Sequence, residues 1–293
     1  MSPASLLRLQ LSVLVTALAV VGAALVVPMW RAMPRLRDRA DAEIAVYDYP
    51  PAGAAACAAG SRPGAAGESP SEETAAQVRY LVKTPANYDA TRAHPLLVVY
   101  SPNGANRFLT ERFVGLTRLA TAAGFVVAYA DSRPLAMTTI ADLGTIPERI
   151  AARWCIDVQR IYLTGHSDGG TVATAIAVLG KSQHPPAAIA PSAAGFRRED
   201  LAAYPCPAPL RVMVLHNRDD DHFPGYGAEA AQWWAACDGC GAVPAQRADG
   251  CLEYPSCKPG SATLYCEGEG GHAAWPDRNQ TILEFLKFLK GTL

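Results

Sequence analysis

The residues best suited to chemistry in this chain surround a serine, in the stretch Gly165-His166-Ser167-Asp168-Gly169. This G-x-S-x-G pattern follows the apolar run 160–163 and precedes an alanine-rich run with the composition of a helix. A turn that leads from a strand straight into a helix leaves space only for small flanking residues, which favours the two glycines. The pattern therefore predicts a nucleophile elbow, in which the helix N-terminus stabilises an anion that develops beside Ser167. A surface turn, the alternative interpretation, would not require a buried strand directly before the serine.

A serine is a weak nucleophile without a general base, and the base needs a third group to orient it. The chain has six histidines. His272 lies in a glycine-rich loop between the last predicted strand and the last predicted helix, where a hydrolase of this strand–helix organisation carries its base. We therefore predict that His272 is the base. His216, at the end of an apolar strand, and His222, directly after an acidic run, remain alternatives.

The orienting acid is expected between the serine and the histidine, after the strand that ends at His216. Asp219, Asp220 and Asp221 stand together there. A solvated charge cluster is the alternative interpretation for any one of them. Because three adjacent carboxylates repel one another, their grouping favours a role for at least one. The strand-end position does not choose among the three.

Short apolar runs alternate with helical patterns from residue 77 onward. Residues 96–100 are continuously apolar, as expected for a strand buried on both faces. The alternation predicts an α/β fold with a mostly parallel sheet and right-handed crossovers, in one catalytic domain at residues 77–293. The predicted strands are 78–83, 96–100, 125–130, 160–163, 187–190, 210–216 and 262–266, and the predicted helices are 108–123, 141–154, 169–180, 225–236 and 278–289.

An uncharged apolar run at residues 11–27 precedes this domain, with Arg8 before it and arginines after it. Its length lies between that of a signal-peptide core and that of a membrane span. Residues 1–30 are therefore predicted to be a signal anchor or a signal peptide, and a buried core helix is the less favoured alternative. An anchor is preferred because no small-x-small cleavage pattern directly follows Val27. Residues 31–76, rich in Pro, Ala and Gly, are predicted to be a linker.

Cysteines are numerous: the chain has eight, and six of them lie in the last 88 residues. In an exported protein this predicts up to four disulfides, whose pairing cannot be deduced from the sequence. Cys237 and Cys240 have the C-x-x-C spacing that zinc sites and redox proteins also use. No second C-x-x-C follows, and the pair comes at the end of a predicted helix, so both alternatives are less favoured.

The composition excludes several classes of protein. With 50% hydrophobic and 18% charged residues, the chain is too apolar for a disordered protein and too sparsely charged for a coiled coil. A formal net charge of −1 provides no general basic field, so no nucleic-acid partner is expected. The arginines after the apolar run count against export under the positive-inside rule, whereas the cysteines count for it. We expect an exported protein, either secreted or anchored in the inner membrane by its N-terminal segment only, with a periplasmic catalytic domain.

Several segments together resemble one known family, from about Cys57 to the C-terminus. The family is that of extracellular polyhydroxybutyrate depolymerases and of feruloyl and acetylxylan esterases, within the α/β-hydrolase superfamily. The resemblance implies an α/β-hydrolase fold and hydrolysis of carboxylic esters, small or polymeric, with no metal and no organic cofactor. It implies that Ser167 is the nucleophile and His272 the base, and its strand-end His-Gly-x-x-Asp pattern aligns the acid with Asp220. The segments that carry it are 80–89, 154–157, 160–170, 187–192, 212–220 and 271–276.

The oxyanion hole departs from the family pattern. Its donors are expected to be the backbone N–H groups of Asp168, directly after the nucleophile, and of Asn103. Asn103 follows from register alone, because Ser101-Pro102-Asn103 replaces the family's His-Gly and proline has no N–H. Loss of one donor lowers turnover about 10²–10³-fold. The altered loop favours an alternative hypothesis, a catalytically impaired, envelope-anchored protein of the same fold that binds a ligand or polymer. A third hypothesis is a thiol-disulfide protein that uses the C-x-x-C cysteines.

Nothing in the sequence specifies the acid or the alcohol portion of an ester. Aromatic side chains could line a substrate site, although ordinary core packing is the favoured interpretation for each of them. The candidates are Phe223, Tyr226, Trp233, Trp234 and Trp275.

Overall fold

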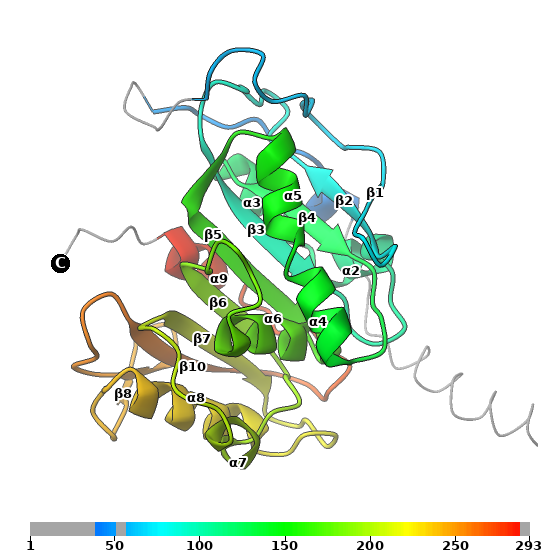
Figure 1. Cartoon of the computed structure of the whole chain (residues 1–293). Coiled ribbons are helices and arrows are strands. Elements are labelled where there is room, and N and C mark those ends of the chain that lie inside the picture. Colours follow the sequence, from blue (N-terminus) through cyan, green and yellow to red (C-terminus); the bar gives the residue numbers. More distant parts are fainter. Residues whose placement is uncertain (1–38, 51–56, 288–293) are drawn as a thin grey trace, which may run out of the picture. The chain divides into compact units, whose positions relative to one another are not determined.

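A ten-stranded sheet runs through the part of the chain that the computed structural model describes, residues 39–50 and 57–287 (Figure 1). The strand order is β1-β2-β4-β3-β5-β6-β7-β10-β9-β8. Neighbouring strands from β4 to β10 in this order are parallel, and antiparallel strands extend both edges. The strands are Glu72–Glu73 (β1), Arg79–Lys83 (β2), His94–Tyr100 (β3), Val126–Ala130 (β4), Ile156–His166 (β5), Ala188–Ser192 (β6), Arg211–Asn217 (β7), Ala245–Gln246 (β8), Leu252–Tyr254 (β9) and Ala262–Gly268 (β10).

Helices cover both faces of this sheet (Figure 1). On one face α5, α6 and α8 contact the strands, with α4 against α6 and α7 against α8; on the other lie α2, α3 and α9. The described helices are Arg107–Val114 (α2), Thr117–Ala122 (α3), Met137–Leu143 (α4), Ile146–Arg153 (α5), Asp168–Leu179 (α6), Arg198–Ala202 (α7), Tyr226–Cys237 (α8) and Asn279–Lys287 (α9), with a 3₁₀ turn, η1, at Arg39–Ala42.

The central strands are buried on both faces, as the continuous apolar runs predict. In β3, Leu96 and Val98 belong to one apolar cluster, whereas Leu97 and Val99 belong to the cluster on the opposite face. All these side chains are fully buried. The predicted parallel α/β sheet is therefore confirmed, and each of the seven predicted strands corresponds to a strand of the structure.

Two of the predicted helices are each split into two in the structure. The helix predicted at 108–123 breaks at Gly115, which has a left-handed φ of 61° and caps α2 through its N–H to the carbonyl of Glu111. The helix predicted at 141–154 breaks around Gly144, where the carbonyl of Lys181 approaches so closely that it leaves no space for a Cβ atom. In both cases the apolar pattern continued across a glycine that the tertiary structure uses to turn the chain.

Part of the segment predicted as a linker is built into the domain. Within residues 57–76, Cys57 forms a disulfide with Cys155, and the carbonyl of Ala65 accepts a hydrogen bond of 3.1 Å from the indole of Trp154. The short strand β1 also lies there and pairs with β2. This part of the chain has no apolar periodicity because it contributes single anchoring residues rather than an amphipathic element.

Four disulfides link all eight cysteines, in agreement with the expected maximum. They join Cys57–Cys155, Cys206–Cys237, Cys240–Cys257 and Cys251–Cys266. Cys237 and Cys240 are therefore bonded to different partners, and their C-x-x-C is neither a redox pair nor a thiolate zinc site. The last two disulfides secure the segment that contains β8 and β9 beside β10. Such bonds are typical of proteins that fold in an oxidising compartment.

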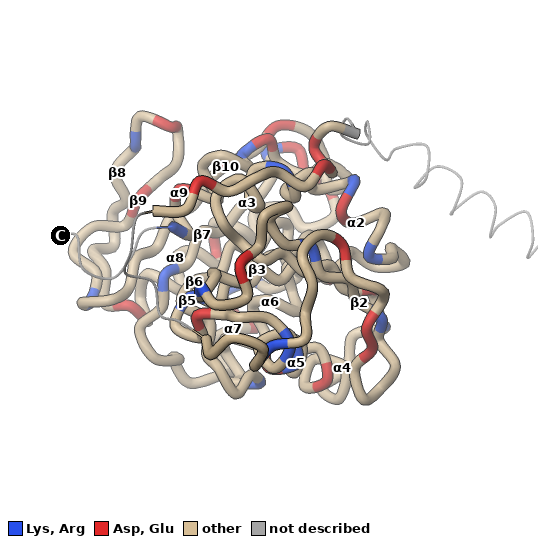
Figure 2. The backbone as a smooth tube through the Cα atoms, turned by 90° about the horizontal axis from the view of Figure 1, so that it is seen from above, with Lys and Arg blue, Asp and Glu red and all other residues tan. Residues whose placement is uncertain are grey.

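The apolar N-terminal segment predicted as an anchor or signal, residues 1–30, lies outside the described residues. In the ranges 39–50 and 57–287, no helix combines the length and the apolar character needed to cross a membrane. Acidic and basic residues are interspersed along the described elements, and neither sign gathers on one side in the view of Figure 2. This distribution agrees with the near-zero net charge of the chain.

A buried carboxyl group lies at the start of the two strands that lead to the candidate site. Asp238 is 2% exposed, and it accepts hydrogen bonds from the N–H of Leu210 (3.3 Å) and the hydroxyl of Thr263 (3.2 Å). Burial raises the pKa of Asp238 to about 6, and the hydrogen bonds and the Lys258 ammonium offset only part of this rise. Asp238 therefore binds a proton more tightly in the folded chain than in the unfolded chain.

Substitution of the elbow glycine, Gly169, tests how closely α6 approaches the sheet. A Cβ atom at Gly169 would lie 2.0 Å from the carbonyl oxygen of Tyr100, so we expect Gly169→Ala to cost about 3 kcal/mol of stability or more. The matched control is Gly180→Ala. Gly180 ends α6 with a φ of 59° and has free space around it, so the cost there is about 1–2 kcal/mol of left-handed strain. Thermal unfolding followed by circular dichroism compares the two, and equal losses of Tm would contradict the packing.

The raised pKa of Asp238 predicts a stability that falls as pH rises. The folded state binds the extra proton between about pH 4 and 6, so its stability decreases through that window as the carboxyl ionises. Asp238→Asn, neutral at every pH, should raise the free energy of unfolding by about 3 kcal/mol at pH 7.5 and leave it nearly unchanged at pH 4. Urea denaturation at the two pH values checks this. A variant with the same gain or loss at both would show that Asp238 is not the group that titrates.

Candidate active site

Ser167 occupies the turn between β5 and α6. It follows His166, the last residue of β5, and precedes Asp168, the first residue of α6. Its backbone has φ 55° and ψ −118°, a conformation that costs energy for a residue with a side chain. Its N–H donates to the carbonyl of Ser192 on the neighbouring strand β6, at 2.9 Å. The predicted elbow is thus present in the strand–turn–helix setting that the sequence indicated.

Ser167, His272 and Asp220 form a hydrogen-bonded chain. The hydroxyl Oγ of Ser167 lies 2.8 Å from Nε2 of His272, and Nδ1 of His272 lies 2.9 Å from Oδ2 of Asp220. A carboxylate only accepts, so Nδ1 carries the proton and Nε2 is free to accept one from the serine. The three side chains follow β5, β7 and β10, whose carboxyl ends meet at one edge of the parallel sheet.

The turn after β7 distinguishes Asp220 from its two neighbours. Asp220 is 4% exposed, whereas Asp219 and Asp221 are exposed. Oδ1 of Asp220 accepts the N–H groups of His222 (3.0 Å) and Phe223 (2.9 Å). Burial raises the pKa of Asp220, but the hydrogen bonds from His272 and Phe223 outweigh it, so the net pKa lies below its usual value. Asp220 therefore remains ionised beside His272.

The alternative histidines, His216 and His222, lie beside the hydrogen-bonded series of Ser167, His272 and Asp220 but are not part of it. His216 is buried at the end of β7, with Nε2 3.5 Å from Oδ2 of Asp220, and burial lowers its pKa. His222 is exposed, and its ring centroid lies 4.7 Å from that of His272. The hydrogen-bond partner of the Ser167 hydroxyl is His272. The structure therefore brings together Ser167 and His272, which the motif and loop context favoured, and Asp220, with which the family resemblance aligned the acid.

The two residues expected to supply the oxyanion donors, Asp168 and Asn103, follow the neighbouring strands β5 and β3. Asp168 begins α6, so its N–H belongs to the first turn, where amides have no partner within the helix. Asn103 is exposed in a turn closed by the N–H of Ala105 and the carbonyl of Pro102, at 3.1 Å. That turn directly follows β3, which pairs with β5 up to Gly165. Asp168 thus directly follows the nucleophile, and Asn103 follows the strand beside β5; that their N–H groups act in catalysis is a proposal.

The aromatic candidates divide between the site and the core. The ring of Phe223 stands nearly perpendicular to that of His272, with centroids 5.0 Å apart, and it stacks on Tyr226 at 5.1 Å. The other three, Trp233, Trp234 and Trp275, are buried in the apolar clusters. Phe223 and Tyr226 therefore border the candidate active site, and the tryptophans stabilise the fold.

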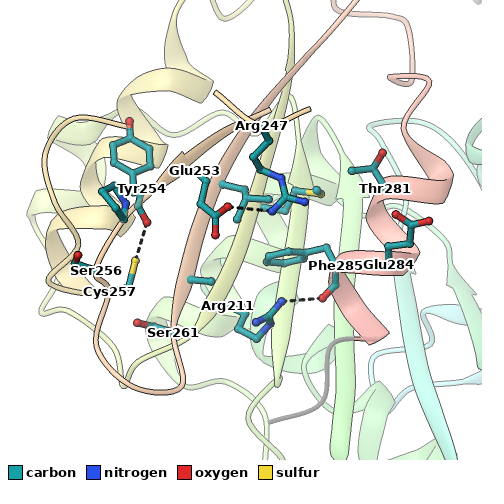
Figure 3. A pocket seen from close by; sticks show the side chains of 14 residues that line it. Arg211, Arg247, Glu253, Tyr254, Ser256, Cys257, Ser261, Thr281, Glu284 and Phe285 are labelled. Carbon is teal, nitrogen blue, oxygen red and sulfur yellow. Dashed lines mark hydrogen bonds and ion pairs between the residues drawn. The ribbon is translucent and has the colours of Figure 1, made fainter. Parts of the chain in front are cut away.

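A pocket of about 490 Å³ lies near the amino ends of β7 and β10 (Figure 3). It is lined by the first residues of β7 and β10, Arg211 and Ala262, and by residues of β9 and α9. Asp220 and His272 follow the opposite, carboxyl ends of β7 and β10, and Ser167 follows the carboxyl end of β5. In Figure 3, Arg247 pairs with Glu253, and Arg211 donates to the carbonyl of Phe285. This pocket is separate from the candidate active site.

Comparison with known proteins finds esterases among the similar sequences and structures. No protein-family model matches the sequence. Feruloyl esterase B of Piromyces equi is 25% identical over 229 residues, which are 67% of this chain and 42% of that protein. The chain thus spans less than half the length of the curated relative that it matches.

Solved structures resemble the fold more completely. The acetyl xylan esterase from Aspergillus awamori gives a TM-score of 0.57 at 15% identity, covering 74% of this chain and 97% of that one. Fluorophosphonate-binding serine hydrolase F of Staphylococcus aureus gives 0.55 at 12% identity, covering 77% and 100%. S-formylglutathione hydrolase of the same organism gives 0.51 at 11% identity, covering 77% and 99%. The chain has the α/β-hydrolase fold of these proteins.

Proposed function

We propose that this protein is a serine esterase that hydrolyses carboxylic esters through Ser167, His272 and Asp220. The observation that carries the proposal is the continuous hydrogen-bonded chain from the serine hydroxyl through the imidazole to the buried carboxylate, at 2.8 and 2.9 Å. The similarity to feruloyl esterase B supports ester hydrolysis as the reaction class.

In the proposed reaction, Ser167 attacks the ester carbonyl while Nε2 of His272 takes the hydroxyl proton. The carboxylate of Asp220 holds the imidazole in the required tautomer and stabilises the imidazolium. The backbone N–H groups of Asp168 and Asn103 bind the oxyanion of the tetrahedral intermediate. His272 gives its proton to the leaving alcohol, and a water molecule, activated by the same imidazole, releases the acyl group. This sequence of steps requires no metal and no organic cofactor.

The substrate class is proposed from the resemblance and from the similar proteins. Feruloyl and acetyl groups on plant polysaccharides and short polyhydroxyalkanoate esters are the substrates to test first. The wall formed by Phe223 and Tyr226 beside His272 supports a flat or apolar group next to the scissile bond. The four disulfides support export of the protein. Residues 1–30 are proposed to be the export signal or an inner-membrane anchor.

A second candidate function is a protein of this fold that binds an ester or polymer without turning it over. The observation that favours it is Pro102, which has no N–H, in the loop where the second oxyanion donor is needed. Binding of a substrate with no release of product by the wild type would support this candidate. The thiol-disulfide hypothesis is wrong, because Cys237 and Cys240 are bonded to Cys206 and Cys257.

Ser167→Ala should abolish activity, because it removes the hydroxyl that is proposed to form the acyl-enzyme. The assay is hydrolysis of p-nitrophenyl esters from acetate to palmitate, followed by methyl ferulate and polyhydroxybutyrate, with the purified full-length chain. We expect at least a 10³-fold loss of kcat and complete loss of labelling by a fluorophosphonate probe. Turnover by the variant equal to that of the wild type would refute the proposed function.

The three adjacent aspartates provide an internal control for the acid. Asp220→Asn removes the charge that holds His272 and should lower kcat about 10³–10⁴-fold. Asp219→Asn and Asp221→Asn change exposed carboxylates and should remain within a few-fold of the wild type. Steady-state kinetics on p-nitrophenyl acetate compare the three. A larger loss in either exposed variant than in Asp220→Asn would move the acid to that position.

A further inference from the structure

His272 lies in a glycine-rich loop that joins β10 to α9, with Gly270 and Gly271 directly before it. Glycine has more backbone freedom than any other residue, so such a loop does not fix its own geometry. A base must nevertheless be held closely, since a displacement of about 1 Å can cost about 10²-fold in rate. Something outside the loop therefore has to hold its main chain.

His166, the residue before the proposed nucleophile, contacts that main chain. Its Nε2 lies 2.6 Å from the carbonyl oxygen of His272, and because a carbonyl only accepts, Nε2 carries the proton. Nδ1 then accepts from the hydroxyl of Ser192, at 3.0 Å. His166 is 2% exposed, and burial lowers its pKa to about 4, so the ring stays neutral at neutral pH.

Aromatic packing fixes the ring of His166 in this orientation. The rings of Phe113 and Trp275 stand at steep angles to it, with centroids 5.1 and 6.1 Å away. Phe113 belongs to α2, and Trp275 lies in the base loop, three residues after His272. The imidazole is thus packed against both α2 and the base loop, and it donates to the carbonyl of His272.

Asn217, the last residue of β7, holds the same loop from a second strand. Its amide Nδ2 donates to the carbonyls of Gly271 (3.0 Å) and Ala274 (2.6 Å), and the residue is 2% exposed. The carbonyls immediately before, at and two residues after the proposed base are therefore each bound by a buried side chain. The two donors come from the strands that also carry Ser167 and lead to Asp220.

We infer that His166 and Asn217 are positioning residues that hold the main chain of the base loop, so that Nε2 of His272 stays within hydrogen-bond distance of Ser167. This inference rests on the proposed function. Both side chains are buried and act through His272, so their loss should lower kcat and leave KM nearly unchanged. For His166, this gives a role to the position directly before the serine in the G-x-S-x-G pattern. The elbow turn itself does not require a histidine there.

The experiment compares His166→Leu, which removes the donor, with His166→Gln, whose amide nitrogen reaches the Nε2 position. We expect His166→Leu to lower kcat about 10- to 100-fold with KM within about 3-fold of the wild type. His166→Gln should recover most of that loss. Thr164→Val is the matched control, because it removes a buried hydrogen bond of 2.6 Å, to the carbonyl of Ala190, from the same strand without touching the base loop. It should lower Tm and leave kcat within 2-fold.

A double variant separates positioning from general destabilisation. In a His272→Ala background the loop carries no base, so His166→Leu should not lower the residual rate further. Asn217→Leu provides an independent test in case His166→Leu does not fold, with the same expected split between kcat and KM. If either folded Leu variant keeps the kcat of Thr164→Val, the inference is overturned. If Ser167→Ala instead hydrolyses esters as fast as the wild type, it is the proposed function that fails.

Discussion

The backbone of Ser167 is held at a positive φ, and the rest of the site depends on that constraint. Such a conformation persists only where its surroundings over-determine it. Here the N–H of Ser167 is fixed by the carbonyl of Ser192, and Gly169 lies so close to Tyr100 of β3 that only glycine fits. Because β3 and β6 are fully buried and β5 is buried over residues 161–166, none of these central strands can move to relax the turn. The cost of the strained residue is therefore offset by the packing of the whole sheet, and the hydroxyl is presented at a fixed place above its edge.

The parallel sheet explains how residues more than 100 positions apart meet. Three strand ends, those of β5, β7 and β10, deliver the serine, the acid and the loop of the histidine to one edge. Another part of the structure lies away from this site: β8 and β9 extend the sheet beyond β10, next to the pocket of Figure 3, and two disulfides secure them. Disulfides therefore stabilise the outer part of the sheet without constraining the loops in which proton transfer is proposed.

The sequence predicts the fold well where local pattern and tertiary packing agree, as in the seven predicted strands. It fails where one residue serves the tertiary structure, as Gly115 does when it ends α2 inside a continuous apolar pattern. Motif and loop context suffice for Ser167 and His272. Among the three adjacent carboxylates, only the family resemblance indicates Asp220, and the physical difference between them is the turn geometry that buries Asp220 alone. The contacts of His166 and Asn217 leave no local signal at all, because each joins a strand end to a loop between 54 and 106 residues away.

His166, His216 and His272 lie close together at the site, and the environments of their rings differ. Burial lowers the pKa of both His166 and His216, so these two rings resist protonation at neutral pH. His272 is less buried, and its Nδ1 donates at 2.9 Å to Asp220, which stays ionised. In the proposed reaction, a proton taken from Ser167 passes to the one ring that faces both the serine and the carboxylate. Because His166 stays neutral, its single N–H remains available for the carbonyl of His272 throughout that reaction. The support of the base is therefore independent of the proton that the base carries.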